Sequence, residues 1–211
     1  MKPLDFLIIG AQKCATTALF EHLRKHPDIA MPLEKEVPFF TGDDCSPESW
    51  DLFAQNHFGS DQNHKLWGKA SPQYMCDPQV PARIQKLMPG VKLVAILRDP
   101  IERTRSHFQM GQRRETETRD FAEAIAPLLA ADSGQAGSSL PVPDHADGYE
   151  SEADFYVAWS EYGRSLEGFN ACFEPGQLLV LYTEELEAEP EATLDRLLEF
   201  IGLPTGFRPD T

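Results

Sequence analysis

The feature that most constrains this fold is a strand, a tight loop and a helix start near the beginning of the chain. The apolar run Phe6–Ile9 stops at Gly10, and an amphipathic stretch begins at Thr16. Such a turn presents free backbone N–H groups and the positive end of a helix dipole, which together bind a phosphate group. Lys13 adds a mobile positive charge, and Thr16 and Thr17 add hydroxyl donors. The stretch therefore predicts an anion-binding loop in an α/β fold.

This loop differs from the Walker A sequence of ordinary ATPases, in which a four-residue spacer precedes Gly-Lys-Ser/Thr. Here Lys13 follows Gly10 by three residues, and two threonines occupy the place of the Lys-Thr pair. A kinase or NTPase also needs a strand-end aspartate for magnesium, and Asp99 is the one candidate. The loop therefore favours an anion site of another kind, with a P-loop kinase or NTPase as the alternative.

Alternating apolar and amphipathic segments predict how the rest of the chain is organised. Buried-strand patterns alternate with helical patterns, which is typical of a parallel sheet with right-handed crossovers. We therefore expect a P-loop-like three-layer α/β fold, with a central parallel sheet flanked by helices. The expected strands are 6–9, 66–69, 92–97 and 177–182, and the expected helices are 16–25, 48–55, 79–88, 101–114, 155–173 and 190–201.

Two stretches lack periodicity. Residues 28–40 read as irregular, and Ala131–Asp154 is rich in Gly, Ser, Pro and Asp. The second is expected to be a long loop that is mobile without an acceptor molecule. At 211 residues the whole chain, 1–211, fits one domain.

The charge of the chain limits its partners. The formal net charge is −15 at pH 7, and an acidic surface repels nucleic acid, long polyanions and anionic membranes. An anionic ligand therefore needs a local basic site. The cations available for it are Lys13, Lys69, Arg98, Arg103 and Arg105.

The termini, cysteines and histidines suggest a cytoplasmic protein without a metal. No apolar run is long enough to span a bilayer, and the first strand begins too near Met1 to leave room for a signal peptide. The four cysteines are scattered, which favours free thiols in a reducing compartment over a zinc site. His22 and His26 have a metal-binding spacing, but no third ligand is apparent.

Four motifs, in order, resemble those of sulfotransferases that use 3′-phosphoadenosine 5′-phosphosulfate (PAPS). Gly-x-x-Lys-x-x-Thr-Thr resembles the family's 5′-phosphosulfate-binding loop. Residues 93–107 resemble its 3′-phosphate-binding strand and helix. Residues 35–40 and 68–74 resemble the segments that carry a catalytic glutamate and lysine in heparan-sulfate-type sulfotransferases. The stretch 178–204 also resembles the late part of these domains.

The resemblance implies a role for each matching residue. Glu36 would be the base that takes the acceptor proton, with a pKa raised by burial beside Phe39 and Phe40. Lys13 and Lys69 would be catalytic cations in place of a metal. Arg98 and Ser106 would clasp the 3′-phosphate. The full set expected to bind the donor is Gly10, Gln12, Lys13, Cys14, Ala15, Thr16, Thr17, Arg98 and Ser106. Arg103 and Arg105 are expected on the helix surface.

Two departures from the family bear on the acceptor and the donor. Pro38 stands where glycan-modifying relatives often carry a histidine, and with the acidic charge this favours a small-molecule, lipid or carrier-bound acceptor. The chain stops at Thr211, where the family continues into a glycine-rich, basic loop over the nucleotide. A non-catalytic module that binds 3′-phosphoadenosine 5′-phosphate (PAP) is therefore a further alternative. Candidate apolar acceptor contacts are Phe39, Phe40, Tyr74, Tyr149, Tyr156 and Trp159.

Overall fold

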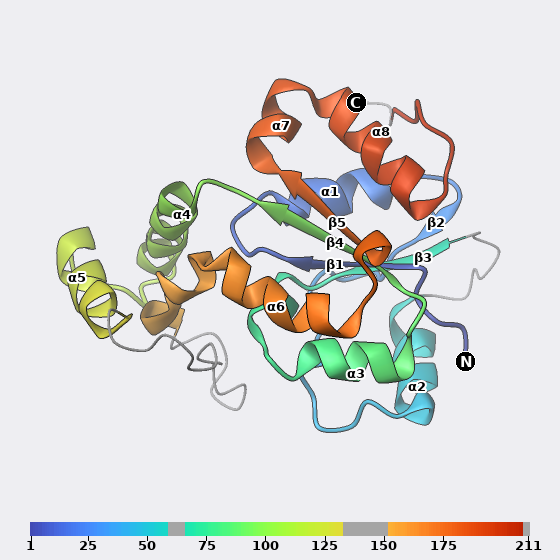
Figure 1. Ribbon diagram of the computed structural model, residues 1–211, viewed down its shortest axis with the longest axis horizontal. Coiled ribbons are helices and arrows are strands. Elements are labelled where there is room, and N and C mark those ends of the chain that lie inside the picture. Colours follow the sequence, from blue (N-terminus) through green and yellow to red (C-terminus); the bar gives the residue numbers. More distant parts are fainter. Residues whose placement is uncertain (59–65, 133–151, 209–211) are drawn as a thin grey trace.

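The computed structural model describes residues 1–58, 66–132 and 152–208 (Figure 1). Residues 133–151, the greater part of the loop expected over 131–154, lie outside this range, as does Tyr149. Among the described residues, no helix is both long and apolar enough to cross a membrane.

A five-stranded parallel sheet forms the centre of the molecule. Its strands lie in the order β2-β3-β1-β4-β5, and every pair is parallel. The strands are β1 (Phe6–Gly10), β2 (Ile29–Ala30), β3 (Leu66–Ala70), β4 (Lys92–Leu97) and β5 (Leu178–Tyr182). All five β1 residues are buried, because helices cover both faces of the sheet. This explains why the strand sequences are continuously apolar.

Helices form a layer on each face of the sheet (Figure 1). One layer holds α1 (Thr16–Leu23), α7 (Thr183–Ala188) and α8 (Pro190–Ile201). The other holds α2 (Pro47–His57), α3 (Val80–Leu87) and α6 (Tyr162–Cys172). Two more helices, α4 (Pro100–Arg113) and α5 (Phe121–Asp132), lie beyond the carboxyl ends of the strands. The predicted three-layer α/β fold is confirmed.

Several segments differ from the sequence-based expectation. The stretch 28–40, expected to be irregular, contains β2, which pairs with β3. The helix expected over 155–173 is broken: a 3₁₀ turn at Ala158–Ser160 precedes α6. The break lets Trp159 stack on His107 and Phe155. The helices α5 and α7 were not expected.

The strand order places two of the predicted motifs side by side. From the central β1 the chain adds β2 and β3 on one side, then β4 and β5 on the other. Ligands of open α/β sheets bind at the carboxyl ends of strands where the order reverses in this way. The backbone N–H of Ala11, just after β1, donates to the Ile96 carbonyl of β4 over 2.8 Å. The β1 loop and the end of β4 therefore share one edge of the sheet.

Candidate active site

The loop after β1 has a strained backbone that exposes the start of α1. Lys13 and Ala15 have left-handed backbones, with φ of 72° and 65°. Ala15 caps α1 and no side chain accepts a hydrogen bond there, so Thr16 and Thr17 do not cap the helix. A Cβ on Gly10 would lie 2.6 Å from Met75 Cβ, so the loop needs glycine at this position. Uncommon backbone angles of this kind concentrate at functional sites.

A pocket of about 370 Å³ opens beside this loop. It brings together four segments distant in sequence: the β1 loop with the start of α1, Glu36, Pro72 after β3, and one side of α4 with the residue that follows it. The lining residues are Gln12, Lys13, Ala15, Thr16, Thr17, Glu36, Pro72, Ser106, Met110 and Arg114. Seven of the residues singled out from the sequence therefore share one pocket, whereas Gly10, Cys14, Lys69 and Arg98 are not in its lining.

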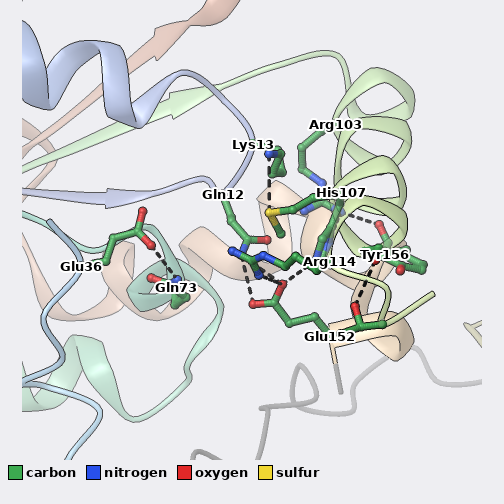
Figure 2. A network of polar contacts seen from close by, with 12 residues as sticks. Gln12, Lys13, Glu36, Gln73, Arg103, His107, Arg114, Glu152 and Tyr156 are labelled. Atoms are coloured by element: carbon green, nitrogen blue, oxygen red, sulfur yellow. Dashed lines mark hydrogen bonds and ion pairs between the residues drawn. The ribbon is translucent and has the colours of Figure 1, made fainter. Parts of the chain in front are cut away.

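Glu36 reaches the pocket from a third residue with a left-handed backbone, at φ 68°. Its Oε1 accepts a hydrogen bond from Lys35 Nζ, and its Oε2 accepts one from Gln73 Nε2 over 3.3 Å (Figure 2). The side chain is 32% exposed. The expected burial of Glu36 beside Phe39 and Phe40 is wrong, because both rings turn into the core.

The aromatic residues proposed as acceptor contacts are mostly core. Phe39 packs against Trp50 and Phe53 of α2, and Phe40 packs against Tyr74. All are buried, and none lines the pocket. The other two described candidates, Tyr156 and Trp159, are also buried, next to His107.

Lys69, the second expected cation, is enclosed at the end of β3. It is 1% exposed, and its Nζ donates to Ser71 Oγ and lies 4.8 Å from the centroid of the Tyr74 ring. Burial lowers the pKa of Lys69 to about 7. Burial and the charges of Lys69 and Lys13 also lower the pKa of Lys35, to about 8. Lys35 therefore belongs with Lys69 and Lys13 to one group of neighbouring cations. The sequence analysis did not single it out.

The end of β4 and the start of α4 are fixed by local contacts. The Asp99 carboxylate caps α4 by accepting from the N–H groups of Ile101 and Glu102. It therefore already has a role at the helix start, which weakens the kinase-like alternative. The side chain of Arg98 lies 3.9 Å from Glu102 in an exposed ion pair. Such pairs contribute little to stability, so a phosphate can replace Glu102 as the partner of Arg98.

Tyr162 connects two of the predicted donor segments. Its hydroxyl donates to the Arg98 carbonyl over 2.9 Å and lies 3.5 Å from Cys14 Sγ. Cys14 is buried, and burial raises the pKa of its thiol, which fits a packing role. Tyr162 was not singled out from the sequence, since nothing around it in the chain marks it.

Arg103 and Glu152 are further residues that sequence reasoning missed. Arg103, expected on the surface, is fully buried. Its guanidinium donates to the Tyr156 carbonyl and to Ser160 Oγ, each over 2.6 Å. Glu152 is 7% exposed and accepts hydrogen bonds from Gln12 and His107 (Figure 2). Arg105, by contrast, lies on the surface as expected.

In the parts of the chain that the structure describes, no group of three or more His, Cys, Asp or Glu side chains is arranged to hold a metal ion. His22 and His26 both pack against the Phe207 ring instead.

Comparison with known proteins places the chain in a family. A family model described as the sulfotransferase domain matches residues 3–209. Mouse heparan sulfate glucosamine 3-O-sulfotransferase 3B1 is 27% identical over 199 residues, which cover 93% of this chain and 45% of that protein. The chain spans less than half the length of the first curated relatives it matches, between 22% and 45%.

Two solved structures are similar in fold. A sulfotransferase from Alicyclobacillus acidocaldarius has a TM-score of 0.80 at 24% identity, covering 100% of this chain and 85% of that one. Mouse sulfotransferase SULT7A1, solved in complex with PAP, has a TM-score of 0.61 at 14% identity, covering 98% and 62%. The family model spans nearly the whole chain and the fold agrees with it. The chain therefore belongs to the sulfotransferase domain family.

Proposed function

We propose that this domain transfers a sulfuryl group from PAPS to a hydroxyl or amine of an acceptor. The observation that carries the proposal is the single pocket in which Lys13, Thr16 and Thr17 meet Glu36 and Ser106. An anion-binding loop, a carboxylate and a second hydroxyl donor on α4 are the groups that this transfer requires. A bare phosphate site gives no role to a carboxylate facing such a loop, and the kinase-like alternative lacks a free strand-end aspartate, since Asp99 caps α4.

The chemistry follows from the charges. The acceptor oxygen or nitrogen forms a bond to sulfur as the bond from sulfur to the bridging phosphate oxygen breaks, and PAP leaves. Glu36, 32% exposed in the pocket, takes the acceptor proton. Lys13 neutralises the charge that develops on the departing phosphate, as in phosphoryl transfer. Lys69 is enclosed, so we assign its charge a longer-range role through Lys35.

For the acceptor, we propose a hydroxyl or amine on a small molecule, a lipid or a carrier-bound group. The net charge of −15 disfavours long polyanions, and Pro38 stands in the segment of Glu36 where glycan-modifying relatives often carry a histidine. We further propose that the domain acts in the cytoplasm and needs no metal.

The donor is tested by thermal shift with PAP and with ATP. PAP should raise the melting temperature more than ATP, because ATP lacks the 3′-phosphate that Arg98 and Ser106 are proposed to bind. Arg98→Ala should weaken PAP binding by about 1.5–3 kcal/mol, the range for hydrogen bonds to charged groups. Arg105→Ala is the matched control, because Arg105 is an exposed arginine on α4, the helix that follows Arg98. Equal stabilisation by ATP and PAP would overturn the donor assignment.

Transfer itself is tested by incubating the domain with PAPS and a panel of acceptors, and by mass spectrometry for the added SO₃. The reaction should survive EDTA. Tight PAP binding without transfer to any acceptor class would support the non-catalytic alternative. Loss of transfer on chelation, restored by magnesium, would support a kinase-like enzyme.

A further inference from the structure

Glu152 is a buried carboxylate next to a loop that is proposed to bind an anion. Gln12 Nε2 donates to its Oε1 over 3.1 Å and to its Oε2 over 3.3 Å. His107 Nε2 lies 3.0 Å from its Oε2, and Arg114 Nη1 lies 3.8 Å from the same oxygen (Figure 2). A negative charge here repels an anionic ligand, so its presence needs an explanation beyond donor binding.

The protonation of His107 can be deduced from its partners. Arg103 Nη2 lies 3.3 Å from His107 Nδ1, and a guanidinium can only donate. Nδ1 is therefore the acceptor, and the ring proton sits on Nε2, which donates to Glu152. Burial lowers the pKa of His107 to about 4, in agreement with a neutral ring. Glu152 is thus held from the core side by a ring that Arg103 orients.

The same contacts fix the side chain of Gln12. Because its NH₂ group points to Glu152, its Oε1 faces the other way, and that oxygen is buried with no hydrogen-bond partner within the described chain. Gln12 is 8% exposed and lines the pocket directly before Lys13. A buried acceptor left without a partner is costly, which suits a position kept for a ligand's donor group.

Glu152 also acts on Lys13 by charge. Burial lowers the pKa of Lys13, and the cations Arg113 and Arg103 of α4 and Arg114, which follows that helix, lower it further. Glu152 opposes them and raises this pKa. Two more charged groups lie near Lys13. The charge of Lys13 lowers the pKa of Lys35, and Glu36 lines the same pocket as Lys13.

We propose that Glu152 is a positioning residue of the donor site, which orients the Gln12 amide and adds a negative charge among Lys13 and the arginines at the end of α4. This rests on the proposed function, since Lys13 is taken as a donor-binding cation. Glu152 is not in the lining of the pocket. It acts through Gln12 and through the charge of Lys13.

The test is the affinity for PAP as a function of pH, measured by calorimetry on the full chain. In a plot of PAP affinity against pH, the affinity should fall on the alkaline side as Lys13 loses its proton. We call this fall the alkaline limb, and Lys13→Met should lack it. Glu152→Gln removes the negative charge, so the fall in PAP affinity should move to lower pH. Arg113→Gln removes an exposed cation and should move the limb to higher pH.

Glu117→Gln is the matched control. Glu117 is also a buried carboxylate in an arginine pair, but its partner is Arg119 and it is not in the lining of the pocket. Glu117→Gln should lower the melting temperature without moving the alkaline limb of the PAP affinity. Glu152→Asp keeps the charge on a shorter side chain. It should leave the limb in place and weaken PAP binding, and this loss should vanish in a Gln12→Ala background.

The outcomes separate the two levels of the proposal. Wild type that fails to bind PAP at any pH overturns the proposed function and this role with it. Normal wild-type binding, with an unmoved limb in Glu152→Gln, overturns only the role of Glu152. Should Glu152→Gln not fold, a Glu152→Asp loss that persists without Gln12 overturns the role equally.

Discussion

Glu36 and Glu152 have similar hydrogen-bond partners but different exposure to solvent. Each carboxylate accepts from a glutamine and from a basic side chain. The Glu36 side chain is 32% exposed, whereas that of Glu152 is 9% exposed and has several donors around it. A carboxylate that must take a proton needs open access, while one that holds its neighbours in place is better enclosed. Exposure, more than the kind of partner, separates the two roles.

The largest expected effect tests the reactive half of this comparison. Glu36→Gln keeps the shape of the side chain but removes its basicity, so kcat should fall by roughly 10²–10⁴, the usual range for a general base. PAP affinity should stay near that of wild type. The measurement is the rate of SO₃ transfer with PAPS and an identified acceptor, and Glu34→Gln, an exposed neighbour, is the control. Turnover near that of wild type would break the comparison, since Glu36 would then be structural.

The next effect concerns the cation beside Glu36. The pKa of Lys35 is lowered to about 8, so Lys35 loses its charge as the pH rises through this value. If its ammonium group orients the Glu36 carboxylate, kcat should decline from about pH 8 upward. Lys35→Met should lower kcat at neutral pH by roughly tenfold, consistent with a hydrogen bond to a charged group, and should lack that decline.

This pH profile is checked against Lys25→Met, an exposed lysine after α1, which should behave like wild type. A decline that persists unchanged in Lys35→Met would assign the titration to another group. The contrast between the two carboxylates would then rest on Glu36 alone.

The smallest effect concerns the amide beside Glu36. Gln73→Leu removes one neutral donor to Oε2, and about 0.5–1.5 kcal/mol per hydrogen bond implies a fall in kcat of roughly two- to tenfold. Gln109→Leu, on the exposed side of α4, is the control. The comparison is sharpened if Gln73→Leu lowers kcat and leaves PAP affinity unchanged. A loss of PAP affinity without a change in kcat would place Gln73 with the donor instead.

The fold and half of the pocket were predictable because they depend on local sequence. The strands β1 and β4 are uninterrupted apolar runs, and the Asp99-Pro100 pair marks the start of α4. The β1 loop carries its glycine, lysine and threonines within eight residues of sequence. Such patterns follow from burial on both sheet faces and from helix-start chemistry, and each can be read within a short window.

The rest of the site depends on contacts across the chain. Glu152 meets Gln12 across 140 positions, and its own neighbourhood in sequence is polar and aperiodic. Arg103 reads as an exposed residue of a polar helix, because its partners Tyr156 and Ser160 come from a later turn that covers α4. Glu36 was expected among aromatic rings because Phe39 and Phe40 follow it. Its left-handed backbone sends the carboxylate to the pocket and leaves the rings in the core.

The uncapped start of α1 has a consequence for local stability. The first N–H groups of a helix have no partner within it, and the cap at Ala15 offers no side-chain oxygen. An anion held at this position would supply the missing acceptor, so the first turn of α1 should open more often in the free protein than in the complex with PAP. Amide hydrogen exchange would report this directly, as slower exchange at Thr16, Thr17 and Ala18 when PAP binds. The ligand would complete the helix it binds to.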